Sequence, residues 1–335
     1  MNNSENRSIF KKILSIISQF MLKQESSIIV VTALYMLFVT SVNPVFISSA
    51  NLFNILKNTG YSLITVVGMA LVLITGGLDL SVGSVLALGG VVTGMACRAE
   101  LPVVAAILLG LMTGVIVGLI NGYIIVKAGV PPLIVTLGMM YVARGAVSVL
   151  TQGVPIYPLP VAFKGIDKIR IAGIPMVVIV AISITLLGYI ILTQTPFGRN
   201  IYALGGNVEA ARISGININK TKMIVYVITS ALASLSGVFI ASRLGSAEAA
   251  AGTGFEMTVI CGAIIGGVST FGGVGSIIGA AIGAFFMEVL TNSLTLMRVS
   301  VYWQNLVVGV VLVLAVLLDQ YKRNVISRNS IKAKK

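Results

Sequence analysis

The sequence predicts an all-α integral membrane protein, a polytopic bundle of about ten transmembrane or partly spanning helices. Of its 335 residues, 57% are hydrophobic and only 10% are charged, whereas a soluble domain carries about 25% charged residues. The mean hydropathy is +1.02. Glycine occurs 36 times, and small residues let helices in lipid approach closely. The remaining charges are too few to cover a water-exposed surface.

Ten apolar segments carry this prediction: residues 27–42, 61–75, 82–97, 101–120, 133–150, 171–192, 223–242, 255–267, 277–296 and 301–318. A full span needs about 20 helical residues. Segments 61–75, 82–97 and 255–267 fall short of this length, which predicts broken or half helices whose ends lie within the membrane. Segment 255–267 either spans the membrane or forms a re-entrant half-helix.

Basic residues gather before the first apolar segment, in a polar loop and at the C-terminus, within a net charge of +13. Such clusters can bind nucleic acid, but here each one flanks a hydrophobic segment, so retention in the cytoplasm is the favoured interpretation. Even numbers of segments separate the three clusters, which predicts that both termini are cytoplasmic. The chain then divides into an amphipathic cytoplasmic segment (1–26), a transmembrane domain (27–319) with a cytoplasmic loop (195–222), and a basic cytoplasmic tail (320–335).

One loop departs from this charge pattern. The same count places residues 151–170 outside the cell, although they include Lys164, Lys168 and Arg170. Three prolines within this stretch identify it as a loop rather than a further span.

The residue types argue against catalysis in this chain. It has no histidine and only two cysteines, Cys97 and Cys261, so it offers no Cys/His zinc site, no disulfide framework and no Ser-His-Asp or Cys-His centre. The phosphate-binding pattern GxxxxGK[ST] is also missing, so the chain is not expected to bind ATP itself. We expect no cofactor and no metal.

The stretch ITGGLDLSVGSVLALGG places Asp79 within an apolar region. Asp79 or Ser81 is suited to cap a helix that starts near Val82, where free backbone N–H groups and the helix dipole offset the cost of a buried carboxylate. The motif either only caps a broken helix or also lines a polar pathway, and the two roles are compatible. Residues 266–283 have a similar pattern, GGVSTFGGVGSIIGAAIG, which indicates either an internal repeat or chance similarity in glycine-rich sequence.

Charged residues within apolar segments and one piece of loop 195–222 also suggest functional roles. Glu288 lies in the middle of an apolar segment, where a carboxylate serves as an ion or proton site or packs against hydroxyl groups of a neighbouring helix. Arg144 is its basic counterpart, and the two are able to pair. In loop 195–222, the piece NVEAARISG predicts a short surface helix, which either docks into the groove of another protein or merely connects two spans.

Four pieces, taken together, resemble a known family: ITGGLDLSVGSVLAL, NGYIIVKAGVPPLIVTLGMMYVARG, TPFGRNIYALGGNVEAARISGINI and GAIIGGVSTFGGVGSIIGAAIGAF. The chain is similar over residues 51–319 to permease subunits of bacterial ATP-binding-cassette (ABC) importers, in the branch that handles ribose, xylose, galactose and related monosaccharides. The resemblance implies a multi-pass protein of the bacterial cytoplasmic (inner) membrane with no enzymatic activity of its own. It identifies loop 195–222 as the coupling loop, through Gly198, Arg199, Glu209, Ala210, Ala211 and Gly215.

The resemblance also implies partners: a cytoplasmic ABC ATPase, an extracytoplasmic sugar-binding protein, and a second permease subunit that is either another copy of this chain or a related one. The protein is expected to be embedded in the lipid bilayer, and no nucleic-acid partner is expected. A sugar needs a path lined by hydrogen-bonding groups, and the candidates for this pathway are Asp79, Ser81, Gly83, Ser84, Ser269, Thr270, Gly275 and Glu288. Ribose is the first choice of substrate, with another sugar, a nucleoside or a furanosyl signal molecule as alternatives. The rival function is an ion-coupled secondary transporter that works alone.

Overall fold

The structure is a computed structural model that describes residues 24–332, with side chains described for residues 27–321. The predicted amphipathic segment 1–26 therefore lies almost entirely outside the described residues. Each of the ten predicted segments corresponds to a helix: α2 (Gln24–Val42), α3 (Ser49–Ile74), α4 (Val82–Arg98), α5 (Val103–Lys127), α6 (Pro132–Thr151), α8 (Met176–Gln194), α11 (Ile218–Leu244), α12 (Phe255–Ile265), α13 (Ile277–Leu296) and α14 (Val301–Lys332). Within the described part of the chain, seven helices are long and apolar enough to cross a membrane. The predicted fold class is confirmed.

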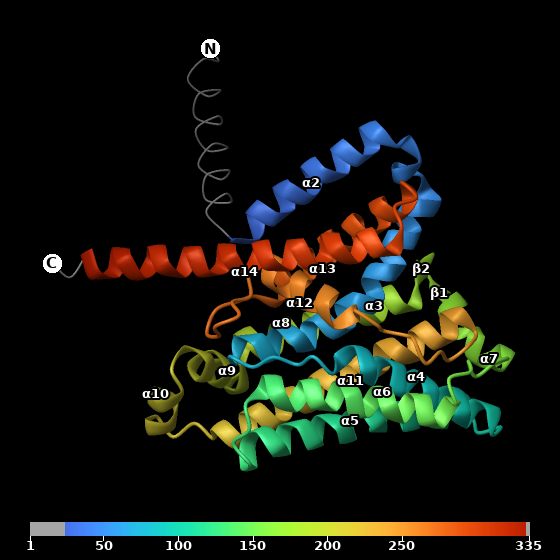
Figure 1. The fold of residues 1–335 in the computed structure, drawn as a ribbon, viewed down its shortest axis with the longest axis horizontal. Coiled ribbons are helices and arrows are strands. Elements are labelled where there is room, and N and C mark those ends of the chain that lie inside the picture. The colour runs from blue at the N-terminus through green and yellow to red at the C-terminus, as the bar shows by residue number, and fades with distance from the viewer. Residues whose placement is uncertain (1–23, 333–335) are drawn as a thin grey trace.

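Short elements lie at the two ends of this bundle (Figure 1). At one end are α9 (Pro196–Gly206) and α10 (Val208–Ile213), and we call this the α10 end. At the other end, called the α7 end, are α7 (Val161–Lys164), the 3-10 helix η2 (Ile166–Lys168), and strands β1 (Arg170–Ile171) and β2 (Ile174–Pro175). The two strands pair antiparallel, with Arg170 opposite Pro175. A further 3-10 helix, η1 (Pro44–Ile47), joins α2 to α3.

The length of α3 corrects one expectation. Residues 61–75 were predicted as a short helix, but α3 begins at Ser49 and runs for 26 residues. Polar residues lower the hydrophobicity of its first half, so the sequence does not show the full length of the helix. Neighbouring elements provide hydrogen-bond and ion-pair partners for these polar side chains. Asn51 donates to the Phe46 carbonyl and to the Asn292 side chain, and Lys57 pairs with Asp167. In the most apolar 18 residues of α3, 78% of the residues are buried, so α3 is a central helix of the bundle.

Helix α5 packs closely against α11 along a stripe of glycines. They are Gly110, Gly114, Gly118 and Gly122. A Cβ atom at Gly114 would lie 2.5 Å from the Ser230 carbonyl oxygen, and one at Gly118 would lie 2.6 Å from the Val227 Cα atom. The Ser234 hydroxyl donates to the Gly110 carbonyl at 2.6 Å. Small residues allow such close approach of helices in lipid, where dispersion contacts and interhelical hydrogen bonds replace the hydrophobic effect.

Three irregular segments interrupt the bundle: residues 75–81 between α3 and α4, 245–254 between α11 and α12, and 266–276 between α12 and α13. The helix α12 that follows the second segment has only 11 residues, about 16 Å of rise, so it crosses only part of a hydrocarbon core about 30 Å thick. Segment 245–254 itself enters the bundle. It pairs with Ile156 at the α7 end through Ala247, yet its Gly252 packs against Gly83 at the start of α4. Broken helices were predicted, and the bundle contains them.

Candidate translocation pathway and coupling surface

Asp79 lies in the first irregular segment and is fully buried. Its Oδ1 atom accepts hydrogen bonds from the Ser81 backbone N–H at 2.9 Å and from the Ser81 hydroxyl at 2.6 Å. Helix α4 begins at the next residue, Val82. Asp79 therefore holds the turn that starts α4, through an Asx-type contact two residues along the chain.

Three other helices direct polar groups toward this turn. The Asn121 amide of α5 donates to the Ser81 hydroxyl at 3.1 Å. The Leu78 carbonyl accepts from the Thr136 hydroxyl of α6 at 3.2 Å and from the Tyr226 hydroxyl of α11 at 3.4 Å. The break between α3 and α4 is thus surrounded by neutral hydrogen-bonding groups in the interior of the bundle.

Some buried polar atoms of α4, α5, α11 and this turn have no hydrogen-bond partner within the described part of the chain. They are Asp79 Oδ2, Ser84 Oγ, Asn121 Oδ1 and Ser230 Oγ. Unpartnered buried polar atoms are uncommon in folded proteins and mark places where function or strain outweighs stability. Two of these residues, Asp79 and Ser84, are pathway candidates from the sequence.

Gly83, another pathway candidate, is the contact point between α4 and segment 245–254. A Cβ atom at Gly83 would lie 2.4 Å from the Gly252 carbonyl oxygen and 2.3 Å from Oε2 of Glu256. Across this contact, Arg144 of α6 donates from Nη1 to the carbonyls of Ala249 at 2.6 Å and Ala251 at 2.7 Å. Arg144 thereby satisfies backbone groups that an irregular segment inside a membrane cannot satisfy itself. Arg144 stands out in the sequence as a charge within an apolar segment, whereas its partners do not.

The second group of candidates lies in segment 266–276 and faces α14. Oδ2 of Asp319 accepts three hydrogen bonds, each at 3.0 Å, from the Ser269 hydroxyl, the Thr270 hydroxyl and the Thr270 backbone N–H. The Gly275 carbonyl accepts from the Tyr202 hydroxyl of α9 at 2.7 Å. Asp319 is not among the predicted site residues, because it ends a hydrophobic run and coincides with the predicted boundary of the transmembrane domain. A lone carboxylate near the end of a span was the available indication.

Segments 75–81 and 266–276 meet each other and α9 at a cluster of glycines. We call it the glycine junction, and it is made of Gly76, Gly205, Gly206, Gly272 and Gly273. The Gly273 N–H donates to the Ile74 carbonyl at 2.8 Å. A Cβ atom at Gly205 of α9 would lie 1.8 Å from that same carbonyl oxygen and 2.4 Å from the Gly273 nitrogen. Gly76 has a φ of 75°, a conformation that glycine adopts at little cost. Loop 195–222 therefore touches both breaks directly through backbone contacts.

The predicted coupling loop contains two helices, of which only α10 was expected. Its cap, Asn207, accepts from the Ala210 N–H at 3.0 Å, and Ala211 is buried beneath it. Glu209 and Arg212 are exposed and pair with each other at 3.0 Å. Ile213, which was not among the predicted coupling residues, is 87% exposed. The remaining predicted residues lie nearby: Gly198 is buried in the first turn of α9, Arg199 is exposed on α9, and Gly215 follows the end of α10 with a φ of 78°.

Comparison with known proteins decides the family. Residues 51–316 match the family described as "Branched-chain amino acid transport system / permease component". The chain is 42% identical over 255 residues to the ribose import permease protein RbsC of Escherichia coli (strain K12), covering 75% of this chain and 79% of that protein. The chain belongs to the ABC-importer permeases of the ribose branch. The resemblance seen in the sequence is confirmed.

Other relatives of this permease differ in the solute that they are named for. The D-allose transport system permease protein AlsC of Escherichia coli (strain K12) is 38% identical over 249 residues, which is 74% of this chain and 76% of that protein. The autoinducer 2 import system permease protein LsrC of Enterobacter sp. (strain 638) is 32% identical over 257 residues, which is 77% of this chain and 75% of that protein. No solved structure matches the chain.

The structure of the permease separates Glu288 from the other pathway candidates. Glu288 lies on α13, where Ser62 of α3 and the Arg243 guanidinium in the last turn of α11 act electrostatically on its carboxylate. Arg144 does not pair with it; the carboxylate that acts electrostatically on Arg144 is Glu256. The other pathway candidates thus fall into two groups. The first is Asp79, Ser81, Gly83 and Ser84, and the second is Ser269, Thr270 and Gly275. The glycine junction joins the segments that carry these two groups.

Proposed function

We propose that this permease carries a monosaccharide of the ribose type across the bacterial cytoplasmic membrane, as one subunit of an ATP-driven importer. An extracytoplasmic binding protein delivers the sugar, and a separate cytoplasmic ATPase binds at α10. A second permease subunit, in the simplest case another copy of this chain, completes the pathway. Both termini then lie in the cytoplasm, on the side of the α10 end. The names of the relatives, two of which refer to ribose and D-allose, support a sugar as the solute.

The glycine junction carries this proposal. A motion of α10 passes along α9 to Gly205, which is in backbone contact with Ile74 at the end of α3 and with Gly273 before α13. Displacement at the surface where an ATPase would bind thus reaches both broken helices without any intervening side chain. The interior around Asp79 offers neutral hydroxyl and amide groups, which suit a solute that is rich in hydroxyl groups and carries no charge.

Reconstitution tests the proposal. The permease is incorporated into liposomes with its ATPase subunit, and uptake of radiolabelled ribose is measured in the presence of binding protein. We expect uptake that requires ATP, the ATPase and the binding protein together. Ribose uptake by the permease alone, driven by an ion gradient and indifferent to ATP, would contradict it. Competition by unlabelled allose, other sugars and nucleosides then ranks the alternative solutes.

Ile213 is expected to be an apolar anchor for the ATPase, because α10 presents it almost fully exposed beside the paired charges of Glu209 and Arg212. Replacement of Ile213 by aspartate should weaken ATPase binding at least roughly tenfold, since central apolar anchors contribute about 2 kcal/mol or more to interfaces. Binding is measured by surface plasmon resonance with the permease in nanodiscs.

The matched control for Ile213→Asp is Val161→Asp, because Val161 is 81% exposed but lies at the α7 end. This control should bind the ATPase as the unmodified permease does. If Ile213→Asp binds equally well, α10 is not the docking surface.

One observation favours the second candidate, an ion-coupled transporter: Asp79 is buried, and its Oδ2 atom has no partner among the described residues. The substitution Asp79→Asn distinguishes the two functions. Under the importer proposal the asparagine Oδ1 atom accepts the same two hydrogen bonds from Ser81, so ATP-driven uptake stays near normal. Asp79→Ala removes both bonds, each about 1 kcal/mol, and should lower the thermal unfolding midpoint. Ion-gradient uptake that is lost in Asp79→Asn would instead establish the carboxylate as a coupling site.

A further inference from the structure

The α7 end of the permease is rich in basic residues, although outward-facing loops of membrane proteins ordinarily carry fewer of them than cytoplasmic loops do. The described basic residues in the elements and turns at this end are Arg98, Lys164, Lys168, Arg170, Arg243 and Arg298, together with Lys57, which pairs with Asp167 of η2. The described acidic residues there are Glu100, Asp167 and Glu248, and the Glu288 carboxylate of α13 acts electrostatically on Arg243 from inside the bundle. Retention in the cytoplasm does not account for this excess, which indicates another role for these cations.

Some of these cations line a cavity of about 350 Å³ between α7, η2 and the end of α11. Lys164, Lys168 and Arg243 line it, and Asp167 is the acidic residue in its wall. The ammonium groups of Lys164 and Lys168 have no hydrogen-bond or ion-pair partner among the residues whose side chains are described. Arg243 is held in place by a hydrogen bond to Asn58 and by its position 5.4 Å above the ring of Tyr61.

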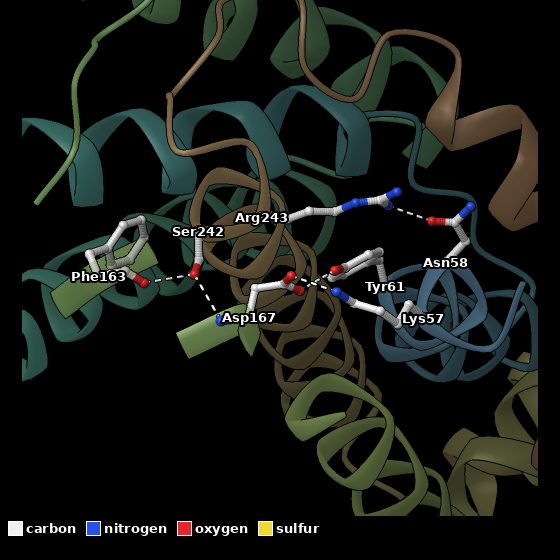
Figure 2. Close-up of polar contacts among 7 residues, drawn as sticks. All are labelled: Lys57, Asn58, Tyr61, Phe163, Asp167, Ser242 and Arg243. Carbon is white, nitrogen blue, oxygen red and sulfur yellow. Dashed lines mark hydrogen bonds and ion pairs between the residues drawn. The ribbon is translucent and has the colours of Figure 1, made fainter. Parts of the chain in front are cut away.

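Asp167 does not neutralise these cations, because other partners already occupy its carboxylate (Figure 2). Its Oδ2 atom is 2.6 Å from Nζ of Lys57, and its Oδ1 atom accepts from the Tyr61 hydroxyl at 2.5 Å. Its backbone N–H donates to the Ser242 hydroxyl at 3.1 Å, and that hydroxyl donates to the Phe163 carbonyl at 2.7 Å. The Asp167 side chain is only 9% exposed. The network thus fixes η2 against α3 and α11 and leaves the cavity with an excess of positive charge.

We propose that this cavity, lined by Lys164, Lys168 and Arg243, receives acidic side chains of the extracytoplasmic sugar-binding protein. The inference rests on the proposed function and names the chemistry of that partner's docking surface. Two ammonium groups and a guanidinium bind carboxylates favourably and speed the encounter with an acidic surface. Val161 borders the cavity and is 81% exposed, and an apolar contact beside paired charges is typical of a protein interface.

A lipid phosphate is the other anion that such a cavity could take. The protein partner is favoured because the cavity is built from α7, η2 and the last turn of α11, at the end where the chain leaves its spanning helices. The exposed side chain of Val161 beside the cavity also offers an apolar contact, which a protein surface is able to use and a phosphate group is not.

The test uses the complete importer, with its ATPase, in nanodiscs of phosphatidylcholine, a lipid with no net charge. The probe is the purified binding protein that supports ribose uptake in the reconstituted system. We compare the double variant Lys164→Glu/Lys168→Glu with the matched control Arg98→Glu/Arg298→Glu, which makes the same charge change at the same end but outside the cavity. Association rates are measured by surface plasmon resonance at low and high salt.

The cavity variant is expected to associate roughly tenfold or more slowly than the control at low salt, and this difference should shrink at high salt. Its ATPase activity without binding protein should match that of the unmodified importer, which shows that the complex has folded. The milder variant Lys164→Gln/Lys168→Gln should give a smaller effect of the same sign.

Equal slowing in the cavity variant and the control would overturn the proposal, since overall charge would then explain the effect. An effect seen only in nanodiscs that contain phosphatidylglycerol would overturn it in favour of a lipid headgroup. Unchanged association with the cavity variant, while uptake still depends on the binding protein, would overturn the docking site and leave the proposed function intact. If no binding protein supports uptake, both proposals fail.

Discussion

Replacement of Gly205 by alanine is expected to reduce ATP-driven uptake roughly tenfold or more, although the change adds a single methyl group. The new Cβ atom would lie 1.8 Å from the Ile74 carbonyl oxygen and 2.4 Å from the Gly273 nitrogen, distances that no pair of unbonded atoms tolerates. Both neighbours are backbone, so no side chain is able to rotate away. Helix α9 must then separate from both irregular segments, at a cost of about 1–3 kcal/mol for overpacking.

Gly206→Ala is the matched control, because no atom outside the local helix lies within 4 Å of a Cβ atom built at Gly206. Uptake and ATPase stimulation by the binding protein are measured for both variants in liposomes. We expect Gly205→Ala to hydrolyse ATP without matching uptake, and Gly206→Ala to behave as the unmodified permease. Normal coupled uptake in Gly205→Ala would show that the glycine junction transmits no motion.

Replacement of Arg144 by methionine is expected to lower the thermal unfolding midpoint by several degrees and to abolish most uptake. Arg144 supplies the hydrogen bonds to the carbonyls of Ala249 and Ala251. Methionine fills a similar volume but donates nothing, so two backbone oxygens inside the bundle lose their partner at about 1–3 kcal/mol each. Segment 245–254 should then shift, and the contact between Gly252 and Gly83 with it.

The control for charge is Arg144→Lys, which keeps the positive charge but loses the planar guanidinium, and an intermediate loss is expected. The control for position is Arg98→Met, which removes an exposed arginine at the end of α4 and should leave the midpoint unchanged. Differential scanning fluorimetry and ribose uptake are measured on all three variants. A midpoint for Arg144→Met equal to that for Arg98→Met would exclude a positioning role for Arg144.

The number and order of the helices follow from the sequence because lipid imposes a simple requirement: each span must bury its backbone hydrogen bonds within a helix of sufficient length. The prediction was wrong where polar residues belong to a span. The first half of α3 contains Asn51 and Lys57, which reduce its apparent hydrophobicity, and their partners lie far along the chain at Asn292 and Asp167. No local pattern shows such pairings.

The candidate site was predictable to a similar extent. Asp79 and Gly83 stood out because a carboxylate and small residues interrupt an apolar stretch. The partners of these residues did not, since Gly252 and Asn121 are unremarkable within their own segments. Asp319 and Gly205 act through contacts made only when α14 and α9 pack against segment 266–276. Residue types thus identify the irregular segments that interrupt the helices. The elements that contact these segments depend on tertiary packing and cannot be found from the sequence alone.

The glycine stripe of α5 has a mechanical consequence. With backbone pressed against backbone at Gly114 and Gly118, and Ser234 bonded to Gly110, α5 and α11 cannot slide past each other without atomic overlap. They form a stiff slab, and α4 belongs to it because its Leu86 carbonyl lies 1.9 Å from a Cβ atom built at Gly237 of α11. If an ATPase displaces α10 as proposed, we expect little of that displacement to be taken up by sliding between these three helices. Under the proposed function, the displacement is expected to rotate the backbone at the non-helical edges of this slab, residues 75–81 and 245–254.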